Sequence, residues 1–161
     1  MIINKYEPTI VNEIINLRIN YFKETYKEFS LIQESHLRKS LLDYFRLHLG
    51  VDCFVAIQSN EGTIVSTSIL SIFSKAPNRS LPNGKYGEIY GVYTVPSERC
   101  KGYATLLIKE LINITNKNDL SFVELEASVD GVPVYSKCGF VKSVNGYLPM
   151  KYICKDNDTL K

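Results

Sequence analysis

A strand, a glycine-containing loop and a helix follow one another directly in the middle of this chain, and this succession constrains the fold more than any other feature. Residues 87–95 have the character of a strand, and residues 104–116 carry apolar side chains at helical spacing. The loop between them, residues 99–105, contains Gly102, which allows the backbone to approach a ligand closely. Such a loop directs free N–H groups and the positive end of a helix at one point, which makes an anion site. The alternative is an ordinary connecting loop in which Gly102 only permits a tight turn.

Length and composition predict one globular domain over residues 1–161. A chain of this length buries roughly 70% of its unfolded surface, which suffices for a sizeable core. The net charge of +2 is too small to indicate nucleic acid or an anionic membrane as a partner. No apolar run approaches the ~18 residues of a membrane helix, and the N-terminus lacks the layout of a signal peptide. We therefore expect a cytoplasmic protein.

The remaining elements follow from hydrophobic periodicity and turn signals. Helices are expected at 8–26, at 33–49, where Gly50 ends the helix, and in a short segment that Asp130 caps and Gly139 ends. Strands are expected at 1–3, 51–58, 63–73, 120–127, 140–144 and 147–154, with turns at 59–62 and at Asn145-Gly146 and a long loop at 74–86.

Several motifs in order resemble one known family. Residues 99–104 read arginine-x-x-glycine-x-alanine, Glu88 stands early in the preceding strand, and Pro96 comes just after it. Residues 134–140 follow with the order valine, tyrosine, serine, lysine, cysteine, glycine, phenylalanine. Together these motifs resemble the GNAT superfamily of N-acetyltransferases, which take their acyl group from acetyl-coenzyme A. The resemblance is clear over residues 87–141.

The resemblance implies an α+β fold: a mixed, mostly antiparallel sheet flanked by helices and splayed open between strands 87–95 and 120–127. The pantetheine arm of acetyl-coenzyme A would pair with the backbone that the splay leaves free. The implied main-chain contacts to this arm are Val92, Tyr93 and Thr94. The implied phosphate contacts are the amides of Cys100, Lys101, Gly102, Tyr103, Ala104 and Thr105, with charge from Arg99 and Lys101.

Acetyl transfer to an amine needs a neutral nitrogen, so a base or a proton-relaying water is useful. Glu88 is the first candidate, since it stands eleven residues before Arg99, as the general base does in the histone-acetylating branch of the superfamily. Alternation along the strand places Tyr90, Val92 and Thr94 on its face. A strand-edge carboxylate that only orients the substrate is the alternative, and Glu126 is the reserve candidate for the base.

Tyr135 occupies the tyrosine position of the family and would donate a proton to the departing thiolate, or else only pack. The amide of Val92 would polarise the acetyl carbonyl. Two residues depart from the family pattern. Ser128 stands where many members carry an asparagine that contacts the cofactor, and Gly131 stands where they carry an alanine.

The acceptor is expected to be a small-molecule amine, and a protein N-terminus or lysine is the alternative. A non-catalytic acetyl-coenzyme A sensor is the rival from another class, and a homodimer is left open. Glu24, Glu28 and Glu34 would attract a cationic amine or form only a solvated face. Tyrosines on the segments that select the acceptor would line its pocket or pack: Tyr21, Tyr26, Tyr44, Tyr86, Tyr90 and Tyr147.

No metal is expected. His36 and His48 stand apart in a helical stretch with no motif around them. The cysteines form no C-x-x-C pair and are expected to be free thiols, with Cys53 and Cys154 packed in strands and Cys100 contributing only its amide.

Overall fold

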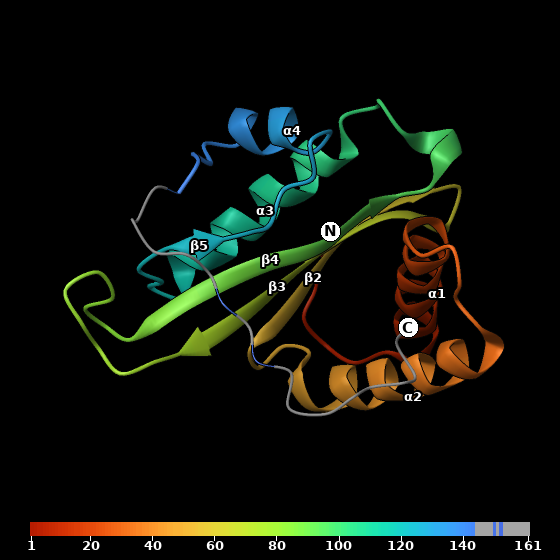
Figure 1. Ribbon diagram of the computed structural model, residues 1–161, viewed down its shortest axis with the longest axis horizontal. Helices are drawn as coiled ribbons and strands as arrows, with labels where there is room; N and C mark the ends of the chain where they lie inside the picture. Colours follow the sequence, from red (N-terminus) through yellow and green to blue (C-terminus); the bar gives the residue numbers. More distant parts are fainter. Residues whose placement is uncertain (144–149, 151, 153–161) are drawn as a thin grey trace.

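The computed structural model describes residues 1–143, 150 and 152, which form a five-stranded sheet flanked by helices (Figure 1). The strands are β1 (Ile2–Ile3), β2 (Cys53–Asn60), β3 (Thr63–Ser74), β4 (Lys85–Thr94) and β5 (Val123–Glu124). The helices are α1 (Pro8–Thr25), α2 (Leu31–His48), α3 (Tyr103–Lys117) and α4 (Val132–Lys137), with a 3-10 turn η1 (Pro96–Glu98). The strands lie in chain order, antiparallel from β1 to β4 and parallel between β4 and β5. No helix in the described ranges is long and apolar enough to cross a membrane.

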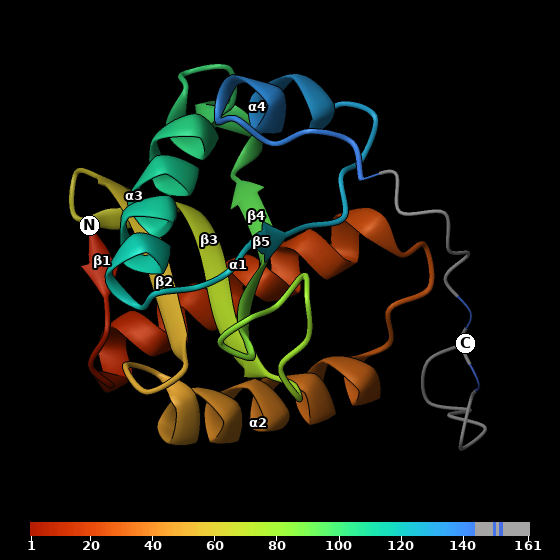
Figure 2. The same ribbon diagram turned by 90° about the vertical axis from the view of Figure 1, so that its left-hand side faces the viewer.

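Two hydrophobic cores lie on the two faces of the sheet, because successive residues of a strand point to opposite sides. Ile69 of β3 packs into the core under α1 and α2, whereas its neighbour Leu70 packs into the core under α3. On α3, the buried side chains Leu107, Ile108 and Leu111 recur at helical spacing and face the sheet. The ribbon shows α1 and α2 on one side and α3 and α4 on the other (Figures 1 and 2).

The predicted long helices are confirmed, and capping groups explain their ends. Helix α2 begins two residues before the predicted start because Ser30 and Gln33 form a reciprocal capping box. Gly50 follows its end with φ +83°, and a Cβ there would lie 1.9 Å from the carbonyl oxygen of Asn4. Only glycine fits both constraints.

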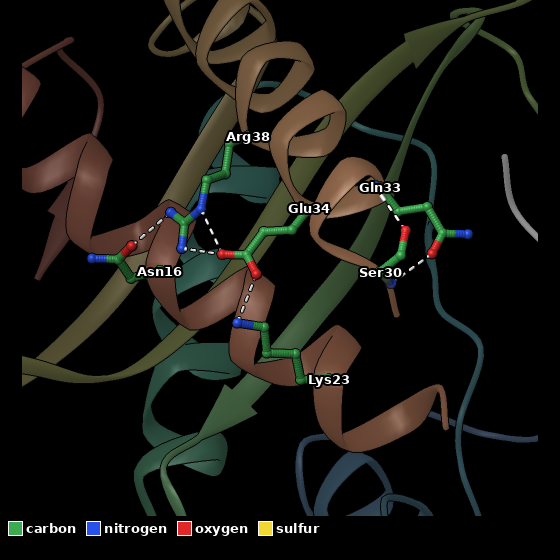
Figure 3. A network of polar contacts seen from close by, with 6 residues as sticks. All are labelled: Asn16, Lys23, Ser30, Gln33, Glu34 and Arg38. Carbon is green, nitrogen blue, oxygen red and sulfur yellow. Dashed lines mark hydrogen bonds and ion pairs between the residues drawn. The ribbon is translucent and has the colours of Figure 1, made fainter. Parts of the chain in front are cut away.

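A polar network fixes α1 against α2 (Figure 3). The carboxylate of Glu34 on α2 contacts Lys23 of α1 at 2.7 Å and Arg38 at 2.9 Å. Arg38 also donates from Nη1 to Asn16 of α1 at 2.8 Å. The hydrogen bonds that Lys23 and Arg38 donate to Glu34 lower its pKa, and the bond from Lys23 contributes most. The network therefore sets the position of α1, which carries side chains of the site described below.

The splay between β4 and β5 is confirmed, but the strand predicted at 120–127 is too long. Only Val123 and Glu124 pair with β4, opposite Gly87 and Glu88. Beyond Glu124 the chain diverges from β4, so the alternating side chains of 125–127 have no strand beside them.

The C-terminal part differs from prediction in two places. Asp130 does not cap α4: the N-cap is Gly131, and the helix begins at Val132 with Pro133 in its first turn. Residues 140–143 adopt no strand. The predicted hairpin at Asn145-Gly146 lies outside the described residues.

Candidate active site

Strand β4 carries a β-bulge in its middle. Its register with β3 shifts between Thr67 and Ile69, so that Gly91 and Val92 together oppose Ser68. Gly91 has φ +61°, a conformation that glycine adopts without steric cost. The bulge therefore turns the second half of β4 relative to the first.

The bulge corrects the predicted strand face. Tyr90 packs in the core under α1 and α2, as does Tyr93, whereas Val92 packs in the core under α3. The prediction that Glu88, Tyr90, Val92 and Thr94 share one face is therefore wrong beyond Tyr90. An inserted residue reverses strict alternation, and simple period-two reasoning does not allow for it.

The same bulge directs two backbone N–H groups at the open side of β4. The carbonyls of Gly91 and Tyr93 face β3, where each accepts a hydrogen bond from a side-chain hydroxyl, at 3.4 and 3.1 Å. Because a trans peptide directs its N–H opposite to its C=O, the N–H groups of Val92 and Thr94 point away from β3. β5 has already diverged at this level, and no other strand of the described residues covers this edge, which we call the free edge of β4. Of the three predicted main-chain contacts, Val92 and Thr94 have N–H groups on the free edge, whereas the carbonyl of Tyr93 is engaged by β3.

The predicted phosphate loop ends at the N-terminus of α3. Gly102 is the N-cap, with φ +82°, and it offers no side chain to the first N–H groups of the helix, those of Tyr103, Ala104 and Thr105. Among the described residues, a Cβ built on Gly102 would meet nothing within 4 Å, so the space beside Gly102 is open. Cys100 also has a positive φ, +62°, and is exposed. An exposed helix N-terminus of this kind fits the phosphates of acetyl-coenzyme A.

The two predicted phosphate cations are each paired with a carboxylate of the chain. Arg99 donates from Nη2 to Glu24 of α1 at 2.6 Å and from Nε to the carbonyl of Thr94 at 3.0 Å. Lys101 contacts Glu98 at 2.9 Å. A role of either cation toward phosphate remains a prediction.

Glu24 connects α1 to β4. One oxygen accepts a hydrogen bond from the hydroxyl of Tyr93 at 2.5 Å and the other contacts Arg99. The hydrogen bond from Tyr93 is the main cause that lowers the pKa of Glu24, and burial is the main cause that raises the pKa of Tyr93 to about 12. Two of the three glutamates expected to attract an amine, Glu24 and Glu34, are thus paired with basic residues of the chain.

Tyr135 is held by the C-terminal geometry of α4. Gly139 has φ +95° and donates to the carbonyl of Ser136, while Phe140 donates to the carbonyl of Tyr135. This is a Schellman motif, and the rings of Tyr135 and Phe140 make its hydrophobic contact edge to face, 6.2 Å apart. Burial raises the pKa of Tyr135, which keeps the phenol protonated. Cys138 ties the helix to the first turn of α3 through the carbonyl of Thr105, at 3.8 Å.

The structure explains why glycine stands at position 131, where many members of the family carry an alanine. A Cβ at this position would lie 2.7 Å from Cε2 of Tyr135, so glycine allows the ring to lie against the start of its own helix. Ser128 accepts a hydrogen bond from the N–H of Gly131 at 3.2 Å. Its predicted contact with the cofactor remains a prediction.

The two candidate bases lie in different settings. Glu88 is half-buried, and it is the last residue of β4 that pairs with β5. Glu126 is exposed and lies beyond the end of β5. The structure thus places Glu88, and not Glu126, where the two strands part.

Sequence reasoning missed Arg18 and the bulge. Arg18 interrupts the apolar stripe of α1 between Ile14 and Tyr21, and it is only 8% exposed. A charged residue in a buried stripe and an isolated glycine inside a strand, Gly91, were the signals that could have found them.

Comparison with known proteins gives the family. The acetyltransferase (GNAT) family profile matches residues 12–140. Over 84 residues, 52% of this chain, the sequence is 30% identical to glucosamine 6-phosphate N-acetyltransferase of Candida albicans, and the match spans about half of that protein, 54%. Among solved structures, a predicted acetyltransferase with acetyl-CoA from Clostridium acetobutylicum has a TM-score of 0.74 at 22% identity, covering 94% of this chain and 96% of that one. Glucosamine-6-phosphate N-acetyltransferase from Arabidopsis thaliana has a TM-score of 0.67 at 20% identity, covering 96% and 99%. The chain belongs to the acetyltransferase (GNAT) family, whose members are acetyl-coenzyme A-dependent N-acetyltransferases.

The loop before α3 is tested by Gly102→Glu, which puts a side chain and a negative charge at the helix N-terminus. We expect acetyl-coenzyme A to raise the melting temperature of the wild type, since a ligand at 100 times its dissociation constant adds about 2.7 kcal/mol. The variant should lose this shift.

Gly62→Glu is the matched control, because Gly62 also has φ +82° and open space around its Cβ, but it lies in the β2–β3 turn. Both variants carry the same backbone strain, and only Gly102→Glu should lose binding in calorimetry. Equal binding of acetyl-coenzyme A by both would show that the loop does not hold the phosphates.

Proposed function

We propose that this protein transfers the acetyl group of acetyl-coenzyme A to the primary amine of a small molecule, by direct attack in a ternary complex. The observation that carries the proposal is the free edge of β4, where the N–H groups of Val92 and Thr94 lie on the strand that leads into the uncapped N-terminus of α3. A backbone edge followed by a helix N-terminus suits a ligand that has amides along one arm and phosphates at its end.

The chain's part in cofactor binding is divided between two elements. The N–H of Thr94 would bind the amide-bearing arm, and the N-terminal amides of α3 would bind the phosphates. Acetyl-coenzyme A supplies an acetyl group activated as a thioester. The N–H of Val92 would stabilise negative charge on the acetyl oxygen as the amine attacks.

Glu88 is the proposed base. An alkyl amine of pKa ~10.4 is almost wholly protonated at neutral pH, and holding it neutral costs ~4.6 kcal/mol at ~1.36 kcal/mol per pH unit. Glu88 accepts the amine proton, directly or through a water, as the new C–N bond forms. Its half-buried place where β4 and β5 part supports this role over that of the exposed Glu126.

Tyr135 is the proposed acid. When the C–S bond breaks, the thiolate leaves with the bonding electron pair and takes the phenolic proton of Tyr135. The raised pKa of Tyr135 supports a protonated phenol at neutral pH, and the Schellman motif fixes its ring.

A small acceptor is favoured over a protein tail by the similarity to glucosamine 6-phosphate N-acetyltransferase, whose name specifies a small amine. A non-catalytic sensor would need neither Glu88 nor Tyr135.

The proposal is tested by a panel of small amines and a lysine peptide, with free thiol release from acetyl-coenzyme A as the readout. Release with a small amine supports the proposal. Release with the peptide alone, or binding of acetyl-coenzyme A without release by any acceptor, contradicts it.

Tyr135→Phe keeps the ring and its contact with Phe140 but removes the proton donor. We expect acetyl-coenzyme A to bind as in the wild type, while kcat falls about 10²-fold. The control is Tyr6→Phe, which removes a phenol hydroxyl in the segment between β1 and α1 that accepts a hydrogen bond from Arg46 in the last turn of α2. An unchanged kcat in Tyr135→Phe would make Tyr135 a packing residue.

Glu88→Gln preserves size but cannot accept a proton. We expect the rate at saturating cofactor to fall most near neutrality and to approach the wild-type rate at about pH 9–10, where more of the amine is already neutral. Glu126→Gln should follow the wild-type profile throughout. A loss that is uniform across pH would indicate that Glu88 only positions the substrate. A loss confined to Glu126→Gln would indicate that Glu126 is the base.

A further inference from the structure

Arg18 is a buried cation beside the bulge of β4. It lies on α1 with 8% of its surface exposed, and its guanidinium faces the bulge of β4. A Cβ built on Gly91 would lie 2.7 Å from Nη1 of Arg18, so glycine at the bulge leaves the space that the guanidinium occupies. Three aromatic rings surround the guanidinium carbon, those of Phe22 at 4.9 Å, Tyr21 at 5.3 Å and Tyr90 at 5.8 Å.

Within the described part of the chain, this cation has no anionic partner. Arg18 forms no ion pair, and its enclosed Nε makes no hydrogen bond. The carboxylate of Glu24 on the same helix is taken by Arg99 and Tyr93, and that of Glu13 accepts the N–H of Ile64. Burial lowers the pKa of Arg18, the expected sign for a desolvated cation. Cation–π contacts offset part of this cost but supply no hydrogen-bond acceptor.

The position of Arg18 suits a contact with the acceptor and not with the cofactor phosphates. The guanidinium touches Gly91, the residue before Val92, from the face of the sheet that α1 covers, opposite to α3. The guanidinium contacts the ring of Tyr21, which lies 6.3 Å from the ring of Tyr93. Tyr21 also contributes, after burial, to the raised pKa of Tyr135. Arg18 therefore lies beside the strand segment proposed for acetyl transfer, whereas Arg99 of the phosphate loop contacts α1 at Glu24, six residues further along the helix.

We propose that Arg18 binds an anionic group, a carboxylate or a phosphate, carried by the same small molecule as the acceptor amine. The proposal rests on the function proposed above and narrows its substrate class to amines that bear a negative charge. The planar guanidinium offers paired donors to such a group, and a bound anion would supply the hydrogen-bond acceptor that the fold withholds. A purely structural cation would be expected to have a carboxylate or carbonyl partner.

Two matched pairs of amines test this proposal and separate its two chemistries. β-Alanine and β-alaninamide differ in a carboxylate, and O-phosphoethanolamine and ethanolamine differ in a phosphate. We expect the wild type to prefer the anionic member of at least one pair in kcat/KM by roughly 10- to 100-fold, as hydrogen bonds to a charged group imply. In Arg18→Met this ratio should collapse through KM, and in Arg18→Lys, which keeps the charge but not the fork, it should fall partway.

A binding measurement separates this inference from the proposed function. With coenzyme A saturating, so that the phosphate loop is filled, the anionic amines should raise the melting temperature of the wild type further, and the neutral amines should not. Arg18→Met should lose this extra shift but keep the shift from coenzyme A, which also shows that it folds. If Arg18→Met does not fold, Arg18→Lys carries the comparison through its reduced shift.

Equal treatment of both members of each pair by the wild type, or an unchanged preference and thermal shift in the Arg18 variants, would overturn the proposal. If no amine is acetylated while the Arg18-dependent shift persists, the proposed transferase function fails and the anion site stands. If amines are acetylated without any charge preference, the function stands and the Arg18 site fails.

Discussion

The β-bulge at Gly91 is the feature on which the rest of the site depends. Without the extra residue, β4 would continue its alternation, and Tyr93 would turn from the core under α1 to the face that α3 covers. With the bulge, the carbonyls of Gly91 and Tyr93 both face β3, and the N–H groups that follow them are left for another partner. A free strand edge of this kind can pair with an extended ligand, as it would with an added strand.

The elements on the two faces of the sheet contribute different groups around this bulge. On one face, α3 presents its N-terminus and α4 positions Tyr135, and the contact of Cys138 with Thr105 links the two helices. On the other face, α1 brings Arg18 against the bulge, and the network around Glu34 fixes α1 to α2. The proposed sites for cofactor and acceptor would thus meet at β4, and direct transfer in a ternary complex requires the reacting atoms to be held close together.

Local motifs made much of this arrangement predictable. The loop 99–105 and the long helices follow from residue types at fixed spacing, whereas Tyr135 and the splayed sheet were implied by the resemblance to the GNAT superfamily. The structure confirms the helices and the splayed sheet. The Schellman motif even explains why glycine and phenylalanine follow Tyr135, since Gly139 alone tolerates φ +95° and Phe140 packs on the ring.

Long-range relations were not predictable in the same way. The length of β5 depends on where its neighbour diverges, which no property of residues 120–127 encodes. The pairing of Glu24 with Arg99 joins residues far apart in sequence, and the isolation of Arg18 is a property of everything packed around it. Such features arise from tertiary packing, and a single sequence read by periodicity does not contain them.

Amide hydrogen exchange at the bulge, followed by NMR, tests the central claim most directly. In the free protein, the N–H groups of Val92 and Thr94 should exchange faster than that of Tyr93, which the ladder register directs at β3. At a concentration of acetyl-coenzyme A that calorimetry shows to be saturating, exchange at Val92 and Thr94 should slow markedly and that at Tyr93 should change little. Unaltered exchange at both Val92 and Thr94 in the saturated protein would contradict the account, because the free edge of β4 would then not be where the cofactor binds.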